Sequence, residues 1–275
     1  MPLTAPDSEY LRTLVRNRSG IVLGEDKGYL LESRLLPLAK VIGLAGLEEL
    51  TARLRVEPSG QLARQVVEAM TTNETFFFRD IHPFECLKKL VLPELIAKRG
   101  GERRLDIWCA AASTGQEPYT IAMVLREHFQ SIASWPTRFI ATDLASEVLK
   151  KAREGRYSQL EVNRGLPAPL LIKYFTKDGL DWKVKDDLKR MVEFKEQNLL
   201  DSFAISGQLD VIFIRNVLIY FDVETKKAIL AKCRKLLRPD GFLFLGGAET
   251  TLNIDDAFVR ADYDKGGCYR LKATP

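Results

Sequence analysis

The stretch Leu105–Tyr119, LDIWCAAASTGQEPY, decides the fold class of this 275-residue chain. Leu105–Cys109 predicts a short buried strand, Ala110–Gly115 a turn of small residues, and Glu117–Phe129 a helix. A strand, a tight turn and a helix in this order are typical of an open α/β sheet, where ligands bind beyond the carboxyl ends of the strands. The turn has one glycine and lacks the Gly-Lys-Ser/Thr of a phosphate loop, which disfavours a pyrophosphate cofactor.

The same alternation continues along the chain. Further strands are predicted at Arg138–Thr142, Leu209–Ile214 and Phe242–Leu245, with helices at Ser146–Gly155 and Val223–Leu237. The stretch KLLRPDGFL is interpreted as a plain helix–turn–strand connection, and YDKGGCYRL as a hairpin that closes the sheet. Strands that alternate with helices of this length predict a parallel sheet covered on both faces.

Two segments depart from this pattern. Residues 1–70 carry apolar side chains at three- and four-residue spacing without a strand signal, so they predict a small all-helical domain. Residues 157–196 contain short alternating segments around a tight turn at Lys177-Asp178-Gly179, which predicts a small antiparallel insert. We therefore expect a helical domain at 1–70, a linker at 71–84 that contributes to the active site, and an α/β domain at 85–275.

The composition excludes several classes of protein. Hydrophobic residues make up 46% and charged residues 28%, which excludes disordered and fibrous chains. A net charge of +4 does not indicate nucleic-acid binding, and no apolar run approaches the roughly 20 residues of a membrane span. Because the first ten residues carry Asp7 and Glu9 and lack an apolar core, we expect no secretory signal.

The cysteines and histidines narrow the chemistry further. Four cysteines lie far apart without paired spacing, so we expect no zinc or other metal, no disulfide framework and a reducing cytoplasm. The chain has only two histidines, His82 and His128. Reactions that depend on histidine as a base or a metal ligand are therefore disfavoured.

The first two predicted strands each lead to a carboxylate at the expected ligand edge. Asp143 directly follows the second strand, where a carboxylate is suited to accept hydrogen bonds from ribose hydroxyls. The alternative is that Asp143 caps the helix beginning near Ser146. Together with Glu117, it favours a nucleoside with a cationic tail over a polyphosphate. This combination indicates S-adenosylmethionine, which has a ribose and an ammonium group but no phosphate.

Two further stretches bring polar residues to the same edge. EFKEQNLLD predicts a strand that delivers Asn198, which would read an adenine edge, with Leu199 against the ring. The strand before Arg215 delivers that residue and Asn216, with Tyr220 one helical turn later. A polar pair at the end of a buried strand is hard to explain by packing, which favours a functional role.

The segment NETFFFR, residues 73–79, precedes the α/β domain. Asn73, Thr75 and Arg79 are spaced by alternation, so they are expected on one side of an extended crossing segment. The three phenylalanines Phe76–Phe78 are either plain core or part of this site.

These pieces together resemble the CheR-type chemotaxis receptor methyltransferases, which transfer a methyl group from S-adenosylmethionine to glutamate side chains of chemoreceptors. The resemblance covers nearly the whole chain and rests on five motifs in the family's order: NETFFFR at 73–79, AAASTGQEPY at 110–119, Thr142-Asp143, Asn198-Leu199-Leu200 and RNVLIYF at 215–221. It implies a Rossmann-like S-adenosylmethionine-dependent methyltransferase domain with a small antiparallel insert, preceded by an all-helical domain.

The resemblance also implies the roles of individual residues. The cofactor contacts of the family fall on Asn73, Thr75, Arg79, Glu117, Asp143, Asn198, Leu199, Arg215 and Asn216. Arg79 and Tyr220 match an arginine and a tyrosine near the transferred methyl group, so they are the expected catalytic residues. Gln116 stands where some relatives are expected to have an acidic residue, which leaves the contact at Glu117 unaffected.

The implied partners are the cytoplasmic domains of chemoreceptors, without nucleic acid or direct membrane insertion, and we expect a monomer. Arg53, Arg55 and Arg64 are either a solvated helix face or a docking surface for these acidic receptors. The short turn at Gly179 favours a member that does not require a peptide tether at the receptor's C-terminus. The alternatives are a methyltransferase of another acceptor and a non-catalytic module that senses the cofactor or docks partners.

Overall fold

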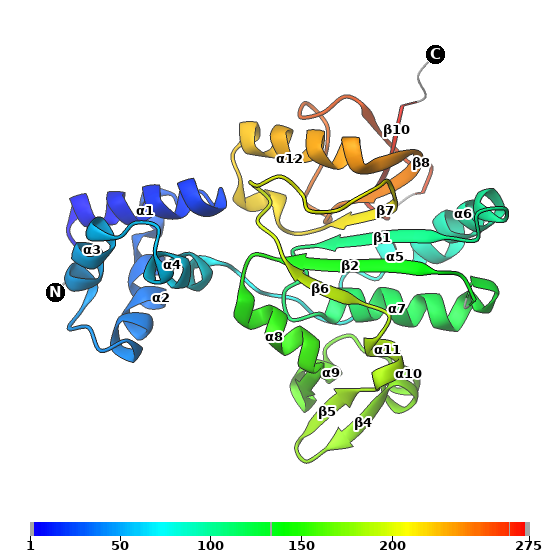
Figure 1. Cartoon of the computed structure of the whole chain (residues 1–275), viewed down its shortest axis with the longest axis horizontal. Coiled ribbons are helices and arrows are strands. Elements are labelled where there is room, and N and C mark those ends of the chain that lie inside the picture. The colour runs from blue at the N-terminus through cyan, green and yellow to red at the C-terminus, as the bar shows by residue number, and fades with distance from the viewer. Residues whose placement is uncertain (1–2, 133, 264, 273–275) are drawn as a thin grey trace.

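The first part of the chain folds into a helical domain of its own, as Figure 1 shows. The computed structural model describes residues 3–132, 134–263 and 265–272. The helices of this domain are α1 (Ala5–Ser19), α2 (Gly28–Val41), α3 (Leu47–Val56) and α4 (Gln61–Met70), with a short 3₁₀ helix at Glu25–Lys27. The predicted apolar spacing buries Leu11, Leu31 and Leu50 completely in a common core. The prediction of an all-helical domain is confirmed.

The second part is built on a sheet that has seven strands within the described residues, in the order β6-β2-β1-β7-β8-β10-β9. The strands are β1 (Leu105–Ala110), β2 (Thr137–Asp143), β6 (Glu193–Glu196), β7 (Leu209–Ile214), β8 (Leu237–Phe244), β9 (Phe258–Arg260) and β10 (Cys268–Leu271). β1 pairs in parallel with β2 on one side and β7 on the other. Their carboxyl ends therefore meet at one edge, where the strand order reverses.

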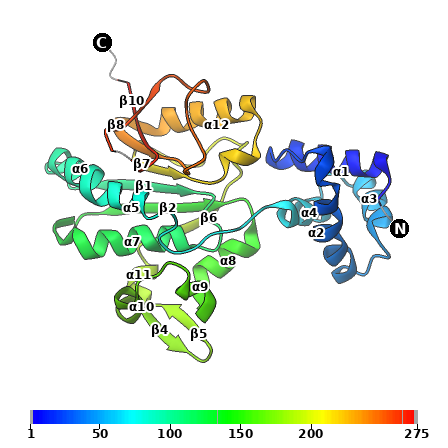
Figure 2. The ribbon, with the colours of Figure 1, turned by 180° about the vertical axis from the view of Figure 1, so that it is seen from behind.

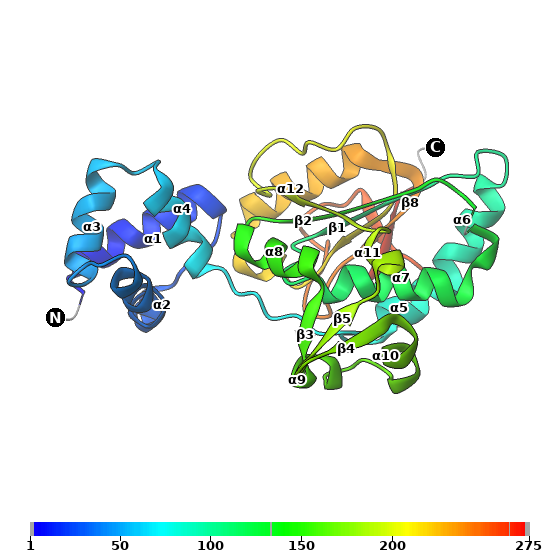
Figure 3. The same ribbon diagram turned by 60° about the horizontal axis from the view of Figure 1, so that its bottom comes forward.

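Helices cover both faces of this sheet (Figure 3). One face packs against α5 (His82–Cys86), α6 (Leu92–Arg99), α7 (Gln116–His128) and α8 (Ser146–Glu154), with a π-helical turn at Leu87–Val91 between α5 and α6. The other face packs against α12 (Val223–Leu236). All residues of β1 and β7 are buried, as expected for central parallel strands with two covered faces. Across the described residues, no helix has the length and apolarity to cross a membrane.

The insert forms a second, antiparallel sheet with the order β3-β5-β4. It comprises β3 (Arg156–Ser158), α9 (Gln159–Asn163), α10 (Ala168–Tyr174), β4 (Phe175–Asp178), β5 (Asp181–Val184) and α11 (Asp186–Lys189). Gly179 makes the predicted turn between β4 and β5 with a φ of 63°. The predicted end at residue 196 is wrong, because Glu193–Glu196 leave the insert and pair in parallel with β2 at the edge of the main sheet.

Three other expectations need correction. The sheet is mixed rather than parallel, because β10 runs antiparallel to both β8 and β9. β8 begins at Leu237, not at Phe242, because Leu237 already pairs with Leu209 and an irregularity in register absorbs the predicted turn. In the predicted terminal hairpin, β10 pairs with β9, which precedes the expected stretch, and Asp264 of that stretch lies outside the described residues.

The helical domain lies beside the carboxyl edge of the main sheet, and the chain crosses from α4 to the sheet in an extended segment (Figure 2). Direct contacts join the two parts. Arg16 of α1 pairs with Asp222 at 2.7 Å, before α12. The Ser146 hydroxyl, at the start of α8, donates to the Glu68 carboxylate of α4 at 3.1 Å. The helical domain therefore closes one side of the edge where a ligand is expected.

Candidate active site

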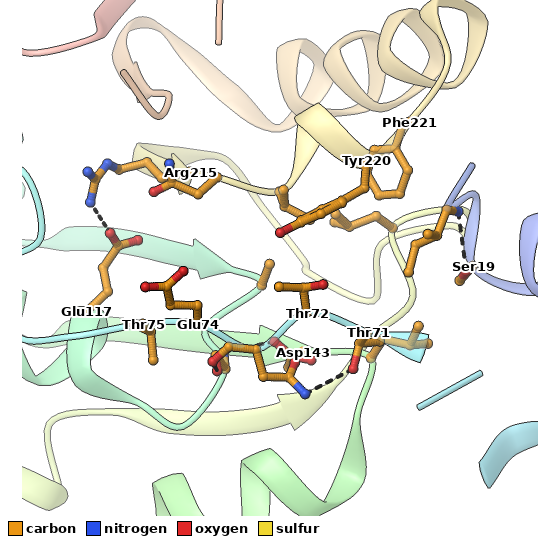
Figure 4. Close-up of a pocket in the computed structure, with 18 of the residues that line it drawn as sticks. Ser19, Thr71, Thr72, Glu74, Thr75, Glu117, Asp143, Arg215, Tyr220 and Phe221 are labelled. Atoms are coloured by element: carbon orange, nitrogen blue, oxygen red, sulfur yellow. Dashed lines mark hydrogen bonds and ion pairs between the residues drawn. The ribbon is translucent and has the colours of Figure 1, made fainter. Parts of the chain in front are cut away.

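A cleft of about 830 Å³ lies at the carboxyl edge of the sheet, beside the helical domain (Figure 4). All predicted cofactor and catalytic residues line this one cleft. They are Asn73, Thr75, Arg79, Glu117, Asp143, Asn198, Leu199, Arg215, Asn216 and Tyr220. Segments far apart in sequence therefore converge here, although what each residue binds stays a prediction.

The small-residue turn after β1 forms part of the cleft wall. Ala111, Ser113 and Gly115 all have left-handed backbones, with φ values of 51°, 50° and 93°. A Cβ on Gly115 would lie 2.9 Å from the Cβ of Ala152 in α8, so only glycine fits there. Two residues outside the strained turn stabilise it. The Ser113 N–H donates to the Asp143 carboxylate, and the Ser113 hydroxyl donates to the Asn73 carbonyl, both at 2.8 Å.

Asp143 ends β2 and is 7% exposed. Burial raises the pKa of its carboxyl above the ordinary value of 3.8, against the opposing effect of hydrogen bonds from the N–H groups of Ala145 and Ser113. It is not a helix cap, because α8 is preceded by Ala145 and has no side-chain cap. A carboxylate offers about four lone pairs, so Asp143 can accept further hydrogen bonds from ligand hydroxyls.

Arg215 and Glu117 form the charged end of the cleft. Their side chains are 1% and 12% exposed and make an ion pair, which Figure 4 marks. Glu117 also accepts a hydrogen bond from the thiol of Cys109 at 3.4 Å, and burial raises the pKa of that thiol well above its ordinary value. Arg215 donates in addition to the Asp80 carboxylate at 2.8 Å. The positive charge of Arg215 therefore compensates the negative charge of Glu117.

The crossing segment places Arg79 over the cleft. One guanidinium nitrogen donates to the Glu74 carbonyl at 2.7 Å, and the Arg79 guanidinium carbon lies 5.5 Å from the centre of the Phe76 ring. Of the three phenylalanines, Phe77 alone is fully buried, with its ring centre 5.1 Å from that of Tyr157. The segment is therefore anchored by Phe77, with Phe78 packed against the same core, while its polar residues line the cleft.

The helical domain contributes a wall that the sequence did not predict. Ser19, the last residue of α1, and Ile21, which follows the helix, line the cleft. The side-chain amide of Asn198 donates to the Arg18 carbonyl at 2.7 Å, so one of its two N–H groups is already used. Leu199 is 7% exposed and belongs to the core beside α12. β6 ends at Glu196, so the cleft residues follow the strand instead of lying in it.

The loop after β7 carries Tyr220 into the cleft from the side opposite Asp143 (Figure 4). This loop ends in a 3₁₀ turn, Leu218–Tyr220. The Tyr220 carbonyl accepts a hydrogen bond from the N–H of Val22 in the helical domain at 2.9 Å. The position of Tyr220 therefore depends on both parts of the chain.

Sequence reasoning missed about half of the cleft lining. The missed residues are Ser19, Ile21, Thr71, Thr72, Glu74, Ala111, Ser113, Leu144, Gln197, Val217 and Phe221. Most are neighbours of predicted residues, so the motifs themselves were a usable signal. Ser19 and Ile21 have no such signal, because only the packing of the helical domain brings them to the cleft.

The arginines expected on the docking surface all pair with carboxylates. Arg53 pairs with Glu49 at 2.8 Å and Arg55 with Asp7 at 3.1 Å, and their side chains are 57% and 47% exposed. Arg64 pairs with Glu196 of β6 at 3.5 Å. The pair of Arg64 therefore reaches across to the α/β domain, whereas the pairs of Arg53 and Arg55 lie within the helical domain.

The residues of the cleft fit S-adenosylmethionine. Asp143 is an acceptor for hydroxyls, and Glu117 is a second carboxylate in the lining of the cleft. The Nε–H of Arg215, a residue of the cleft lining, is buried without a hydrogen-bond partner among the described residues, so this donor remains unused. Within the same described residues, no group of three or more His, Cys, Asp or Glu side chains is placed to hold a metal ion.

A cleft with this donor and acceptor set, at the switch point of a seven-stranded α/β sheet, is typical of S-adenosylmethionine-dependent methyltransferases. Comparison with known families agrees. The model of the CheR methyltransferase S-adenosylmethionine-binding domain matches residues 73–266, and that of the CheR methyltransferase all-alpha domain matches residues 6–71. The chain therefore belongs to the CheR methyltransferase family and is an S-adenosylmethionine-dependent methyltransferase.

Individual relatives match over almost their whole length. The chain is 42% identical to chemotaxis protein methyltransferase Cher2 of Pseudomonas putida, over 97% of this chain and 98% of that protein. It is 43% identical to chemotaxis protein methyltransferase 1 of Pseudomonas aeruginosa, with the same coverage. A solved complex of DhpI with S-adenosylhomocysteine is similar to 70% of this chain and 75% of that one, with 18% identity and a TM-score of 0.32.

Proposed function

We propose that this enzyme transfers the methyl group of S-adenosylmethionine to glutamate side chains in the cytoplasmic domains of chemoreceptors, for adaptation in chemotaxis. The observation that carries the proposal is the convergence of Arg79 and Tyr220 on the cleft that holds Asp143 and Glu117. An acceptor carboxylate and a sulfonium cofactor can then meet in one site. The names of the chemotaxis relatives support the same substrate class.

The chemistry requires little from the protein besides alignment. S-adenosylmethionine supplies a methyl group that the sulfonium already activates. A glutamate with a pKa of about 4.3 is ionised at neutral pH, so no general base has to be supplied. Neither His82 nor His128 is among the described residues that line the cleft. What remains is positioning, which can contribute up to roughly 7–11 kcal/mol to lowering the barrier.

Each side of the cleft has a separate role in this proposal. Asp143 holds ribose hydroxyls, while Asn198 and Leu199 hold the adenine. Arg79 orients the acceptor carboxylate through the guanidinium donors that Glu74 does not use. Tyr220 donates its hydroxyl hydrogen to the same carboxylate. A stronger grip by Arg79 would stabilise the ground state and blunt the nucleophile, so its role is orientation and not activation.

Docking adds a second contact with the receptor. We place it on Arg53, Arg55 and Arg64 of the helical domain, where an acidic receptor helix would compete with the carboxylates that pair with them. Such exposed pairs contribute little to stability, so exchanging their partners costs little. In this proposal the enzyme is a cytoplasmic monomer, and the insert does not need to bind a receptor tether.

The test is incubation with methyl-labelled S-adenosylmethionine and chemoreceptor cytoplasmic fragments from the same cell, followed by peptide mapping. Label on glutamates supports the proposal. A matched receptor fragment with the mapped glutamates changed to alanine should lose the label. Label on another residue type would indicate a methyltransferase of another acceptor. Tight cofactor binding without transfer to any fragment would indicate a sensing module.

A further inference from the structure

A buried glutamate outside the cleft holds the loop that carries Tyr220. Glu249 follows β8 and is 9% exposed. One of its carboxylate oxygens, Oε2, accepts hydrogen bonds from the N–H of Asn216 at 2.8 Å and the N–H of Gly246 at 2.6 Å. The other, Oε1, accepts from the N–H of Ile219 at 3.3 Å. Two of these three donors belong to the loop between Arg215 and Tyr220.

The backbone at this contact is strained and tightly packed. Asn216 has a φ of 57°, a left-handed conformation that costs free energy for a residue other than glycine. A Cβ on Gly246 would lie 2.8 Å from the Asn216 nitrogen and 2.8 Å from Oε2 of Glu249. The Gly246–Glu249 loop therefore closes tightly against the left-handed backbone of Asn216.

The far end of the same loop is fixed as well. The N–H of Val22 donates to the Tyr220 carbonyl at 2.9 Å, and Asp222 then caps α12 by accepting a hydrogen bond from Thr225. Glu249 thus secures the start and middle of the loop, and the helical domain secures its end. Asn216 and Tyr220, at the two ends of this loop, both line the cleft.

We propose that Glu249 is a positioning residue for methyl transfer, which acts by fixing the Asn216–Tyr220 backbone so that Tyr220 meets the acceptor. The inference rests on the proposed function for the role of Tyr220, and on geometry alone for the role of Glu249 in the loop. A carboxylate suits this task because it accepts hydrogen bonds on both oxygens and has no donor to repel the three N–H groups. An active-site misplacement of about 1 Å can cost 10²-fold in rate, which sets the scale of the effect.

The experiment compares Glu249→Ala and Glu249→Gln with Thr250→Ala. Glutamine keeps one acceptor oxygen, which can serve Asn216 and Gly246. Thr250 is exposed in the same loop, and its hydroxyl accepts a hydrogen bond from the Leu252 N–H instead. We expect Glu249→Ala to lower kcat by about 10²-fold with a much smaller change in the receptor KM and in S-adenosylhomocysteine affinity. Glu249→Gln should recover most of the rate, and Thr250→Ala should match the wild type.

A readout independent of methyl transfer completes the test. Hydrogen exchange at the amides of Asn216 and Ile219 should accelerate in Glu249→Ala but not in Thr250→Ala. In the double variant with Tyr220→Phe, the two losses of rate should be less than additive, because Glu249 acts through Tyr220. Unchanged exchange, or a Glu249→Gln variant as slow as Glu249→Ala but equally well folded, would overturn the inference. A wild-type enzyme inert toward receptors would count against the proposed function alone, and the exchange result would still decide the role of Glu249.

Discussion

Arg215 at the end of β7 and Glu117 in the first turn of α7 form an ion pair at the end of the cleft, with Arg215 almost fully buried. The same guanidinium reaches Asp80 and the Arg79 carbonyl in the crossing segment, at 2.8 and 3.2 Å. Arg215 therefore joins the sheet, the helix after β1 and the segment that carries Arg79. A single side chain couples the cofactor side of the cleft to the acceptor side.

Arg215→Met should be strongly destabilising, because it leaves the Glu117 carboxylate buried without its partner. Breaking a buried pair in this way costs about 3–5 kcal/mol. Urea denaturation measures the free energy of unfolding. The matched control is Arg64→Met, whose pair with Glu196 is exposed and should contribute only about 0–1 kcal/mol. Equal losses of unfolding free energy in the two variants would mean that the buried pair of Arg215 does not stabilise the fold more than an exposed pair does.

Asp143→Ala should weaken the binding of S-adenosylhomocysteine by about 1.5–3 kcal/mol, because the ribose hydroxyls would lose a charged acceptor. Calorimetric titration of a variant shown to be folded measures this loss. If the affinity of the folded variant equals that of the wild type, Asp143 does not contact the ligand.

Cofactor binding should depend on the ionisation of Asp143. Its pKa is raised by burial, so acidification protonates this carboxyl at a pH above its ordinary value of 3.8 and removes the acceptor. The affinity for S-adenosylhomocysteine should therefore fall as the pH falls through the folded pKa, and Asp143→Asn should lack this component. The effect on stability has the opposite sign, because the raised pKa favours folding below pH 3.8 and this contribution is lost as the pH rises. A wild-type pH dependence of binding identical to that of Asp143→Asn would rule out this role.

Arg79→Ala and Tyr220→Phe should lower kcat far more than they lower cofactor affinity, because both act on the acceptor in the proposed mechanism. Steady-state kinetics at saturating receptor, together with calorimetry of S-adenosylhomocysteine, separates the two effects. Near wild-type turnover in either variant would remove that residue from the acceptor site.

Arg53→Glu with Arg55→Glu should slow receptor methylation at low salt, and the difference should shrink at high salt as charges are screened. Cofactor binding should not change. Lys227→Glu on α12 is a matched control, because Lys227 is 47% exposed and also pairs with a glutamate, Glu224. Equal rates in the docking variant and the wild type at low salt would place the docking surface elsewhere.

The sequence predicted best those cleft residues that directly follow the end of a strand. Asp143 and Arg215 could be assigned to one edge from the topology of parallel strands alone, and the structure brings both to the cleft. The ends of strands were predicted less well where the local composition suggests a turn but the backbone pairs as a strand. Pro239 and Gly241 suggested a turn, yet β8 runs through them with an irregularity in register, because β7 pairs with Leu237 before them and with Phe242 after them.

Contacts between distant segments could not be predicted. Ser19 lines the cleft only because the helical domain packs against the sheet, and no local pattern records that packing. Glu249 lies in a loop whose composition indicates nothing more than a turn. Its role depends on hydrogen bonds from the N–H groups of Asn216 and Ile219, which lie 33 and 30 residues earlier in the chain.

The measurement that tests the central claim most directly is the chemical stability of the transferred methyl group. Receptor fragments labelled by the wild-type enzyme are treated with mild alkali, which hydrolyses carboxyl methyl esters to methanol but leaves N-methyl and S-methyl groups in place. A glutamate acceptor predicts that alkali releases the label as volatile methanol. The Tyr220→Phe variant should label the receptor fragments weakly or not at all, before any treatment with alkali. Label that stays on the receptor after alkali would contradict the account.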